Sequence, residues 1–268
     1  MDNDFHAVGY KQLGKTGEKV SEIGLGTYGI GDYKKGEEAF VYALERGINF
    51  IDTAEIYNTE DFVGRVIKRV GRENLFITTK VWPKNLTSKE STIKAAKGSL
   101  KRLGINSVDL ILIHWPHDTM RIEDQVKNIE SVQKKGLSRY IGISNFSMEQ
   151  TEEAWSATSS TEIVCNQVKY NLEEREYEKD VIPYCEEKGI SVVAYTPISK
   201  GKSSKTPELR EVSNSMGKTP IQVSLNFLLS SPSVIPIPKT ENLEHMKEIL
   251  GSTGWRLKVD QIELLKKR

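Results

Sequence analysis

Three ionisable residues, Asp52, Lys80 and His114, could do acid–base chemistry because of where they stand in the chain. Each follows directly after a short stretch of branched or aromatic apolar residues. Stretches of this kind are typical of strands that are buried on both faces of a parallel sheet covered by helices. In α/β barrels the carboxyl ends of such strands meet at one mouth, which holds the active site. We therefore expect these three side chains to converge.

Tyr57, five residues beyond Asp52, completes a set that could protonate a carbonyl group. A free phenol has a pKa of about 10, and a neighbouring ammonium group would lower it, so Lys80 would make Tyr57 a usable proton donor. Asp52 would keep Lys80 charged and oriented. A neutral His114 would hydrogen-bond the carbonyl oxygen and stabilise the developing alkoxide. These groups supply no hydride, so a cofactor must supply it.

Each of these residues also has a simpler interpretation when it is taken alone. Asp52 and Lys80 could form a structural ion pair at a barrel rim, and His114 could be a satisfied core residue. His114 and His117 are three residues apart, but Pro116 lies between them, so we expect no metal site. The joint placement of all four residues favours chemistry over the simpler interpretations.

The pattern of the whole chain predicts an α/β fold, a (β/α)8 TIM barrel preceded by a hairpin over residues 10–20. We expect strands over residues 21–25, 49–52, 75–80, 110–114, 140–143, 163–166, 191–194 and 234–237. We expect helices over residues 34–46, 60–70, 88–103, 122–135, 176–188, 206–216, 219–229 and 260–267, and another starting near residue 241. The sequence shows no linker, so we expect residues 1–268 to form a single domain. A doubly wound sheet is the alternative, but it would be expected to carry a G-x-G-x-x-G motif that directly opens a helix. Residues 24–29 have this spacing, but the helix that follows is predicted to begin only at residue 34.

Composition narrows the possible partners and location. The 268 residues carry a formal net charge of +1, which indicates neither a nucleic acid nor an anionic membrane as partner. No apolar run reaches the roughly 18 residues of a membrane span, and the first residues lack a signal-peptide core, so we expect a soluble cytoplasmic protein. Cys165 and Cys185, the only cysteines, read as buried structural thiols.

Residues 47–64, GINFIDTAEIYNTEDFVG, resemble the signature of the aldo-keto reductase superfamily. The residues that stand at the spacing of that pattern are Phe50, Asp52, Ala54, Tyr57, Glu60 and Gly64. The resemblance continues in family order through residues 24–28, 79–82, 114–116, 141–146, 166–167, 194–197 and 235–240. It covers nearly everything from Tyr10 to Leu257, and so many pieces in one order make it highly specific.

This resemblance implies an NAD(P)H-dependent reductase of aldehydes and ketones. Tyr57 would be the general acid, tuned by Lys80 and Asp52, with His114 orienting the carbonyl. Ser144, Asn145 and Gln167 would hold the nicotinamide carboxamide, and Tyr195 would stack on its ring. The other residues implied at the cofactor are Gly26, Thr27, Tyr28, Asp52, Thr196, Pro197, Ile198, Lys239, Thr240, His245 and Glu248. Those implied at the substrate are Tyr28, Trp82, His114 and Trp115.

Two departures from the family pattern bear on the choice of cofactor. Lys239 and Thr240 match positions that contact the 2′-phosphate of NADP, but His245 stands where many members carry arginine. Imidazole attracts phosphate only when it is protonated. Ile249 also replaces a common asparagine beside Glu248. We expect NADP(H) to be preferred and NAD(H) to be usable.

The chain ends soon after the last predicted helix, so we expect no long C-terminal lid over the pocket. We also expect a small-molecule carbonyl substrate, a site that accepts many such compounds, and a monomer or weak homo-oligomer.

Two other functions remain open. Some relatives serve as cofactor-sensing auxiliary subunits, which would make the chain a binding module. A Schiff-base aldolase using Lys80 is the second, but it would leave Asn145, Gln167 and Tyr195 unexplained.

Overall fold

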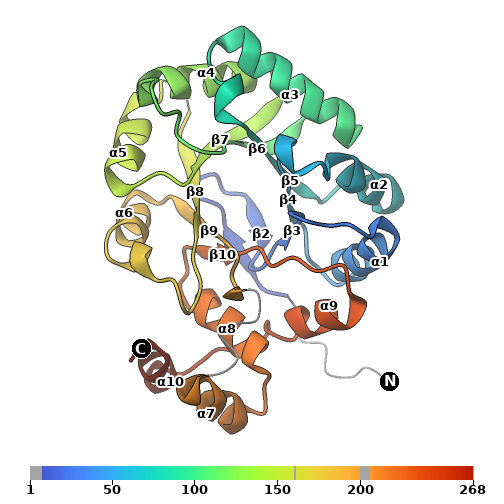
Figure 1. Ribbon diagram of the computed structural model, residues 1–268, viewed down its shortest axis with the longest axis vertical. Coiled ribbons are helices and arrows are strands. Elements are labelled where there is room, and N and C mark those ends of the chain that lie inside the picture. Colours follow the sequence, from blue (N-terminus) through green and yellow to red (C-terminus); the bar gives the residue numbers. More distant parts are fainter. Residues whose placement is uncertain (1–7, 160, 200–205, 268) are drawn as a thin grey trace.

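Eight parallel strands, β3 to β10, follow one another around the sheet in chain order. The structure is a computed structural model that describes residues 8–159, 161–199 and 206–267. Backbone hydrogen bonds from Gly24 to Pro236 and from Gly26 to Pro238, both 2.9 Å, join the first strand segment to the last and close the barrel (Figure 1). The strands are β3 (Leu25–Gly26), β4 (Phe50–Asp52), β5 (Phe76–Val81), β6 (Val108–Ile113), β7 (Ser138–Ser144), β8 (Ile163–Lys169), β9 (Ser191–Tyr195) and β10 (Val234–Pro236). The predicted (β/α)8 fold is confirmed.

Helices surround the barrel and bury its outer face (Figure 1). They are α1 (Tyr33–Leu44), α2 (Glu60–Val70), α3 (Lys89–Leu103), α4 (Ile122–Lys134), α5 (Met148–Ala157), α6 (Val181–Lys188), α7 (Pro207–Met216), α8 (Pro220–Leu229), α9 (Leu243–Leu250) and α10 (Val259–Lys266). Every residue of β5 and β6 is buried, as continuous apolar strands between two packed layers require. Within the described residues, no helix is long and apolar enough to cross a membrane.

The amino end of the barrel is closed by the predicted hairpin. Its strands, β1 (Tyr10–Gln12) and β2 (Lys19–Ser21), pair antiparallel. Leu13 and Val20 of this hairpin pack into the barrel interior with Phe50 and Phe76 and with their apolar neighbours from the other strands. The interior is therefore a packed core and not a pore.

Three details of the fold differ from the sequence-based predictions. The first barrel strand is not residues 21–25 but the two-residue β3, because Ser21 pairs within the hairpin. Helix α5 was not predicted; only Thr151 and Ala154 of this helix are buried, so its apolar period is weak. The helix expected over residues 176–188 divides into a 3-10 turn, η3 (Glu176–Glu178), and α6, which begins after the Asp180 N-cap.

Candidate active site

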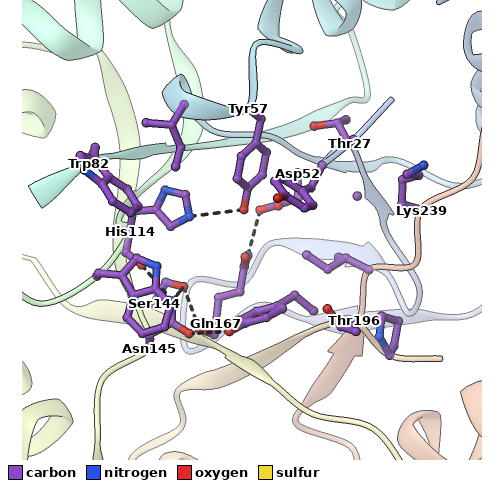
Figure 2. A pocket seen from close by; sticks show the side chains of 18 of the residues that line it. Thr27, Asp52, Tyr57, Trp82, His114, Ser144, Asn145, Gln167, Thr196 and Lys239 are labelled. Carbon is purple, nitrogen blue, oxygen red and sulfur yellow. Dashed lines mark hydrogen bonds between the residues drawn. The ribbon is translucent and has the colours of Figure 1, made fainter. Parts of the chain in front are cut away.

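A cavity of about 690 Å³ opens at the carboxyl ends of the barrel strands. The loops that follow the strands supply its walls, so residues distant in the sequence meet there (Figure 2). The lining residues are Gly26, Thr27, Tyr28, Gly29, Asp52, Ile56, Tyr57, Trp82, His114, Trp115, Ser144, Asn145, Gln167, Tyr195, Thr196, Pro197, Ile198, Ile237 and Lys239. Most of the residues predicted for the site are therefore brought together in one place.

Lys80 lies beneath the cavity floor and is fully buried. From β5 its Nζ donates to Asp52 Oδ1 on β4 at 2.5 Å and to the carbonyl oxygen of Thr53 at 2.9 Å. Burial alone would lower the pKa of Lys80, but the Asp52 carboxylate and the Tyr57 hydroxyl outweigh it and raise the pKa above its ordinary value. Burial raises the pKa of Asp52 against the pull of Lys80. The pair keeps a cation under the cavity.

Tyr57 ends the 3-10 turn η1 (Glu55–Tyr57), which follows β4 and leads into Asn58 with φ 56°. Its hydroxyl lies 3.5 Å from Lys80 Nζ and 3.3 Å from His114 Nε2. The pKa of Tyr57 does not fall as the sequence led us to predict. Lys80 does lower this pKa, but burial raises it by more, so the net shift is upward. Tyr57 consequently keeps its proton at neutral pH and has one to donate.

His114 follows β6 and is held neutral. Burial, and then the nearby Lys80 ammonium, lower the pKa of His114 to about 3. Its Nδ1 atom is buried and has no hydrogen-bond partner among the described residues. The ring of Trp82, which follows β5, meets the imidazole edge-on with centroids 5.1 Å apart. A neutral imidazole facing the cavity beside Tyr57 agrees with the role expected for His114.

Amide and hydroxyl groups from β7, β8 and β9 form the opposite wall of the cavity (Figure 2). Asn145 Nδ2 donates to the carbonyl oxygen of His114 and to Ser144 Oγ, each at 3.0 Å, and Asn145 Oδ1 accepts from Tyr195 OH at 2.9 Å. Gln167 Nε2 donates to Asp52 Oδ2 at 2.8 Å. These contacts connect the amide wall to the Asp52–Lys80 pair.

Three predicted cofactor residues, Thr240, His245 and Glu248, do not line the cavity. They belong to the segment that runs from β10 into α9, where the His245 backbone N–H donates to the Asn242 cap. Ile237 and Lys239 of this segment reach the cavity, and Figure 2 shows Lys239 across the space from His114 and Trp82. Thr196, Pro197 and Ile198 do line it, as expected.

The structure adds Gly29, Ile56 and Ile237 to the lining residues. Of these, Ile56 stands inside the signature stretch directly before Tyr57, a position that could have indicated its place. Among the described residues, no three His, Cys, Asp or Glu side chains gather as a metal site would require.

Residues 22–267 match the sequence model of the Aldo/keto reductase family. The chain belongs to this family. It is 35% identical over 234 residues to methylglyoxal reductase DkgB of Escherichia coli O157:H7, covering 83% of this chain and 86% of that protein. Its fold matches the crystal structure of the thermostable aldo-keto reductase Tm1743 with a TM-score of 0.91 and 39% identity, over 96% of this chain and 98% of that one. An aldo/keto reductase from Klebsiella pneumoniae, crystallised with NADP and acetate, matches with a TM-score of 0.87 and 27% identity. The match covers 96% of this chain and 93% of that one.

This reductase therefore reduces carbonyl compounds with NADP(H), which sets aside the aldolase and the binding-module alternatives. Its cavity carries amide and hydroxyl groups that suit a carboxamide and a cation that suits a phosphate. Ser144, Asn145 and Gln167 present hydroxyl and amide groups at one wall, as a carboxamide requires. Lys239 presents a cation at the other, and no described carboxylate forms an ion pair with it.

Proposed function

We propose that Tyr57 is the proton donor of this reductase and that Lys80, Asp52 and His114 support it. The observation that carries the proposal is the position of the Tyr57 hydroxyl at the cavity wall, between Lys80 Nζ at 3.5 Å and His114 Nε2 at 3.3 Å. A proton donor must lie within about 3 Å of the atom that it protonates. A carbonyl oxygen in the space before Tyr57 and His114 would satisfy that requirement for both.

The roles of the residues follow from their charges. The bound cofactor supplies the hydride, and the protein supplies the proton and the orientation. His114, being neutral, donates from Nε2 to the carbonyl oxygen while Tyr57 transfers its proton to the same atom. The Lys80 ammonium then stabilises the phenolate that Tyr57 becomes. Asp52 holds Lys80 charged and in place, and Gln167 holds the second oxygen of Asp52 at 2.8 Å.

The amide wall and Lys239 would select and orient the cofactor. Ser144, Asn145 and Gln167 would hold the carboxamide, and Tyr195 would fix the face of the ring that points toward Tyr57. Lys239 would attract the 2′-phosphate, assisted by Thr240, while the non-lining His245 and Glu248 would lie toward the adenine. With one permanent cation at that end, we expect NADPH to be preferred and NADH to be used at a lower kcat/KM.

The substrates we propose are small aldehydes and ketones, with 2-oxoaldehydes as the first class to test. Tyr28, Ile56 and Trp115 stand at the mouth with 71%, 40% and 43% of their surfaces exposed, which makes the cavity wide and apolar at its entrance. The relationship to a methylglyoxal reductase supports the same class. A single-domain monomer or weak homo-oligomer in the cytoplasm completes the proposal.

A panel of carbonyl compounds tests this function. The purified protein is assayed for NADPH oxidation with methylglyoxal, unbranched aldehydes, simple ketones and aldose sugars, and again with NADH. We expect turnover of several aldehydes, with methylglyoxal among the best, and a kcat/KM that favours NADPH. In Lys239→Ala the ratio of kcat/KM with NADPH to kcat/KM with NADH should fall toward one, while the rate with NADH stays unchanged. Activity on one compound alone, or a clear preference for NADH, would contradict the proposal.

A further inference from the structure

The carboxylate of Glu55 joins two segments that carry the site. Glu55 begins the η1 turn that ends at Tyr57. Its Oε1 accepts the backbone N–H of Trp82, and both of its oxygens accept from Asn85 Nδ2 at 3.0 Å. Trp82 directly follows β5, the strand that carries Lys80. One side chain therefore connects the turn of the proposed proton donor to the loop beyond the buried lysine.

This connection completes a ring of contacts around the proposed reaction centre. Trp82 meets the His114 ring edge-on at 5.1 Å, and His114 Nε2 lies 3.3 Å from the Tyr57 hydroxyl. Glu55 then returns from the Tyr57 turn to the Trp82 backbone. Displacing either segment would change the separation of Tyr57 and His114.

Among the described residues, the η1 turn has few side-chain contacts besides those of Glu55 and of the Tyr57 ring and hydroxyl. It is three residues long and only partly buried, and Ile56 is 40% exposed. Its other side-chain hydrogen bonds join the Tyr57 hydroxyl to Lys80 and His114, and the Tyr33 hydroxyl donates to the carbonyl oxygen of Asn58, directly after the turn, at 2.8 Å. Hydrogen bonds to an ionised acceptor are the stronger kind. Glu55 is therefore well suited to fix the turn.

We propose that Glu55 is a positioning residue that sets the Tyr57 hydroxyl against His114 and Lys80. Glu55 does not line the cavity, so it acts through Tyr57 and Trp82 and does not touch the substrate. The inference rests on the proposed role of Tyr57 as proton donor. Its effect should appear in kcat, because a displacement of about 1 Å near a reaction centre can reduce the rate by up to about 100-fold.

Four variants test the positioning role: Glu55→Ala, Glu55→Gln, Asn85→Ala and the double variant Glu55→Ala/Asn85→Ala. We expect Glu55→Ala to lower kcat by about 10- to 100-fold while the Kd for NADPH, followed by fluorescence, changes by less than about twofold. Glu55→Gln keeps an acceptor for the Trp82 N–H, so it should restore most of the rate. Because Asn85 acts through Glu55, the double variant should be no slower than Glu55→Ala.

Glu130→Ala is the matched control. Glu130 is a buried carboxylate on α4 that accepts from Ser159 N at 2.7 Å and Ser159 Oγ at 2.6 Å, and it does not line the cavity. It should lower the melting temperature and leave kcat unchanged. The inference is overturned if Glu55→Ala keeps kcat within about threefold, if the two single losses multiply, or if Glu130→Ala lowers kcat equally.

Tyr57→Phe is measured in the same assay to separate the two proposals. If Tyr57→Phe loses turnover but Glu55→Ala does not, only the role of Glu55 is wrong. If Tyr57→Phe keeps normal turnover, the proposed function itself is wrong.

Discussion

The two ends of the barrel each hold a lysine ammonium group away from bulk solvent, but they hold it by different means. At the carboxyl end, Lys80 contacts the Asp52 carboxylate at 2.5 Å. At the amino end, Lys11 of β1 donates to three carbonyl oxygens, those of Leu229, Ser231 and Val234, at 3.1, 2.7 and 2.6 Å. The first amine has a charged partner in contact, and the second has only backbone acceptors.

The pKa values move in opposite directions as a result. Burial lowers the pKa of Lys11 to about 7, against a weaker upward pull from Glu22. The pKa of Lys80 is raised, because Asp52 and Tyr57 outweigh its burial. A carboxylate in direct contact keeps a buried amine charged, whereas carbonyl groups anchor it without fixing its charge.

At the amino end, the carboxylate of Asp109 binds groups from neighbouring strands and loops. Asp109 accepts from Arg72 at 2.6 Å, from Arg139 at 3.0 Å and from the backbone of Ile77 at 2.8 Å. At the carboxyl end, Tyr57 and His114 face a cavity and retain the capacity to bond a ligand. Buried charge is therefore informative about function where it lies beside a titratable group that faces open space.

The largest effect should come from removing the phenolic hydroxyl. Tyr57→Phe removes the proposed proton donor and should lower kcat for methylglyoxal by about 10²- to 10⁴-fold. The Kd for NADPH, measured by fluorescence quenching, should stay near that of the wild type because the amide wall is intact. A kcat within tenfold of the wild type would show that another group donates the proton.

Replacing each of the two lysines by methionine tests the comparison directly. Lys80→Met leaves Asp52 buried without its partner and should cost about 3–5 kcal/mol of unfolding free energy together with nearly all turnover. Lys11→Met leaves backbone carbonyls without a donor and should cost about 1–3 kcal/mol, with kcat unchanged. Urea unfolding and steady-state rates measure both. If Lys11→Met loses turnover while it is fully folded, the two lysines do not differ in the way that we propose.

A smaller effect concerns the pH dependence of stability and involves His114. Its pKa is about 3 in the folded protein against an ordinary value of 6.5, so between these values the unfolded chain binds a proton that the folded protein does not. Stability should fall as the pH is lowered through that range. In His114→Gln this contribution is absent, so its unfolding free energy should decline less between pH 7 and about pH 5. Parallel declines would contradict a neutral buried imidazole.

The sequence predicts the candidate catalytic residues better than it predicts some of the helices and strands. Asp52, Lys80 and His114 could be found because each ends an apolar strand, and parallel strands bring their ends to one mouth. Helix α5 was missed because it buries only Thr151 and Ala154, although Ser147 and Gln150 form a readable capping box.

What could not be predicted depends on distances across the fold. The net pKa shift of Tyr57 depends on the depth of burial, which residue spacing does not report. The contacts of Glu55 with Trp82 and Asn85 join residues 27 and 30 positions apart, and no local pattern indicates them. No local pattern indicates that Ile237, which directly follows β10, lines the cavity.

A crystal structure of the protein with NADP⁺ and an unreactive carbonyl compound would test the central claim most directly. The account predicts the carbonyl oxygen within about 3 Å of both Tyr57 Oη and His114 Nε2, with Lys80 Nζ still close to the phenol. A carbonyl oxygen held by other groups, out of reach of the Tyr57 hydroxyl while the nicotinamide ring faces the substrate, would contradict it.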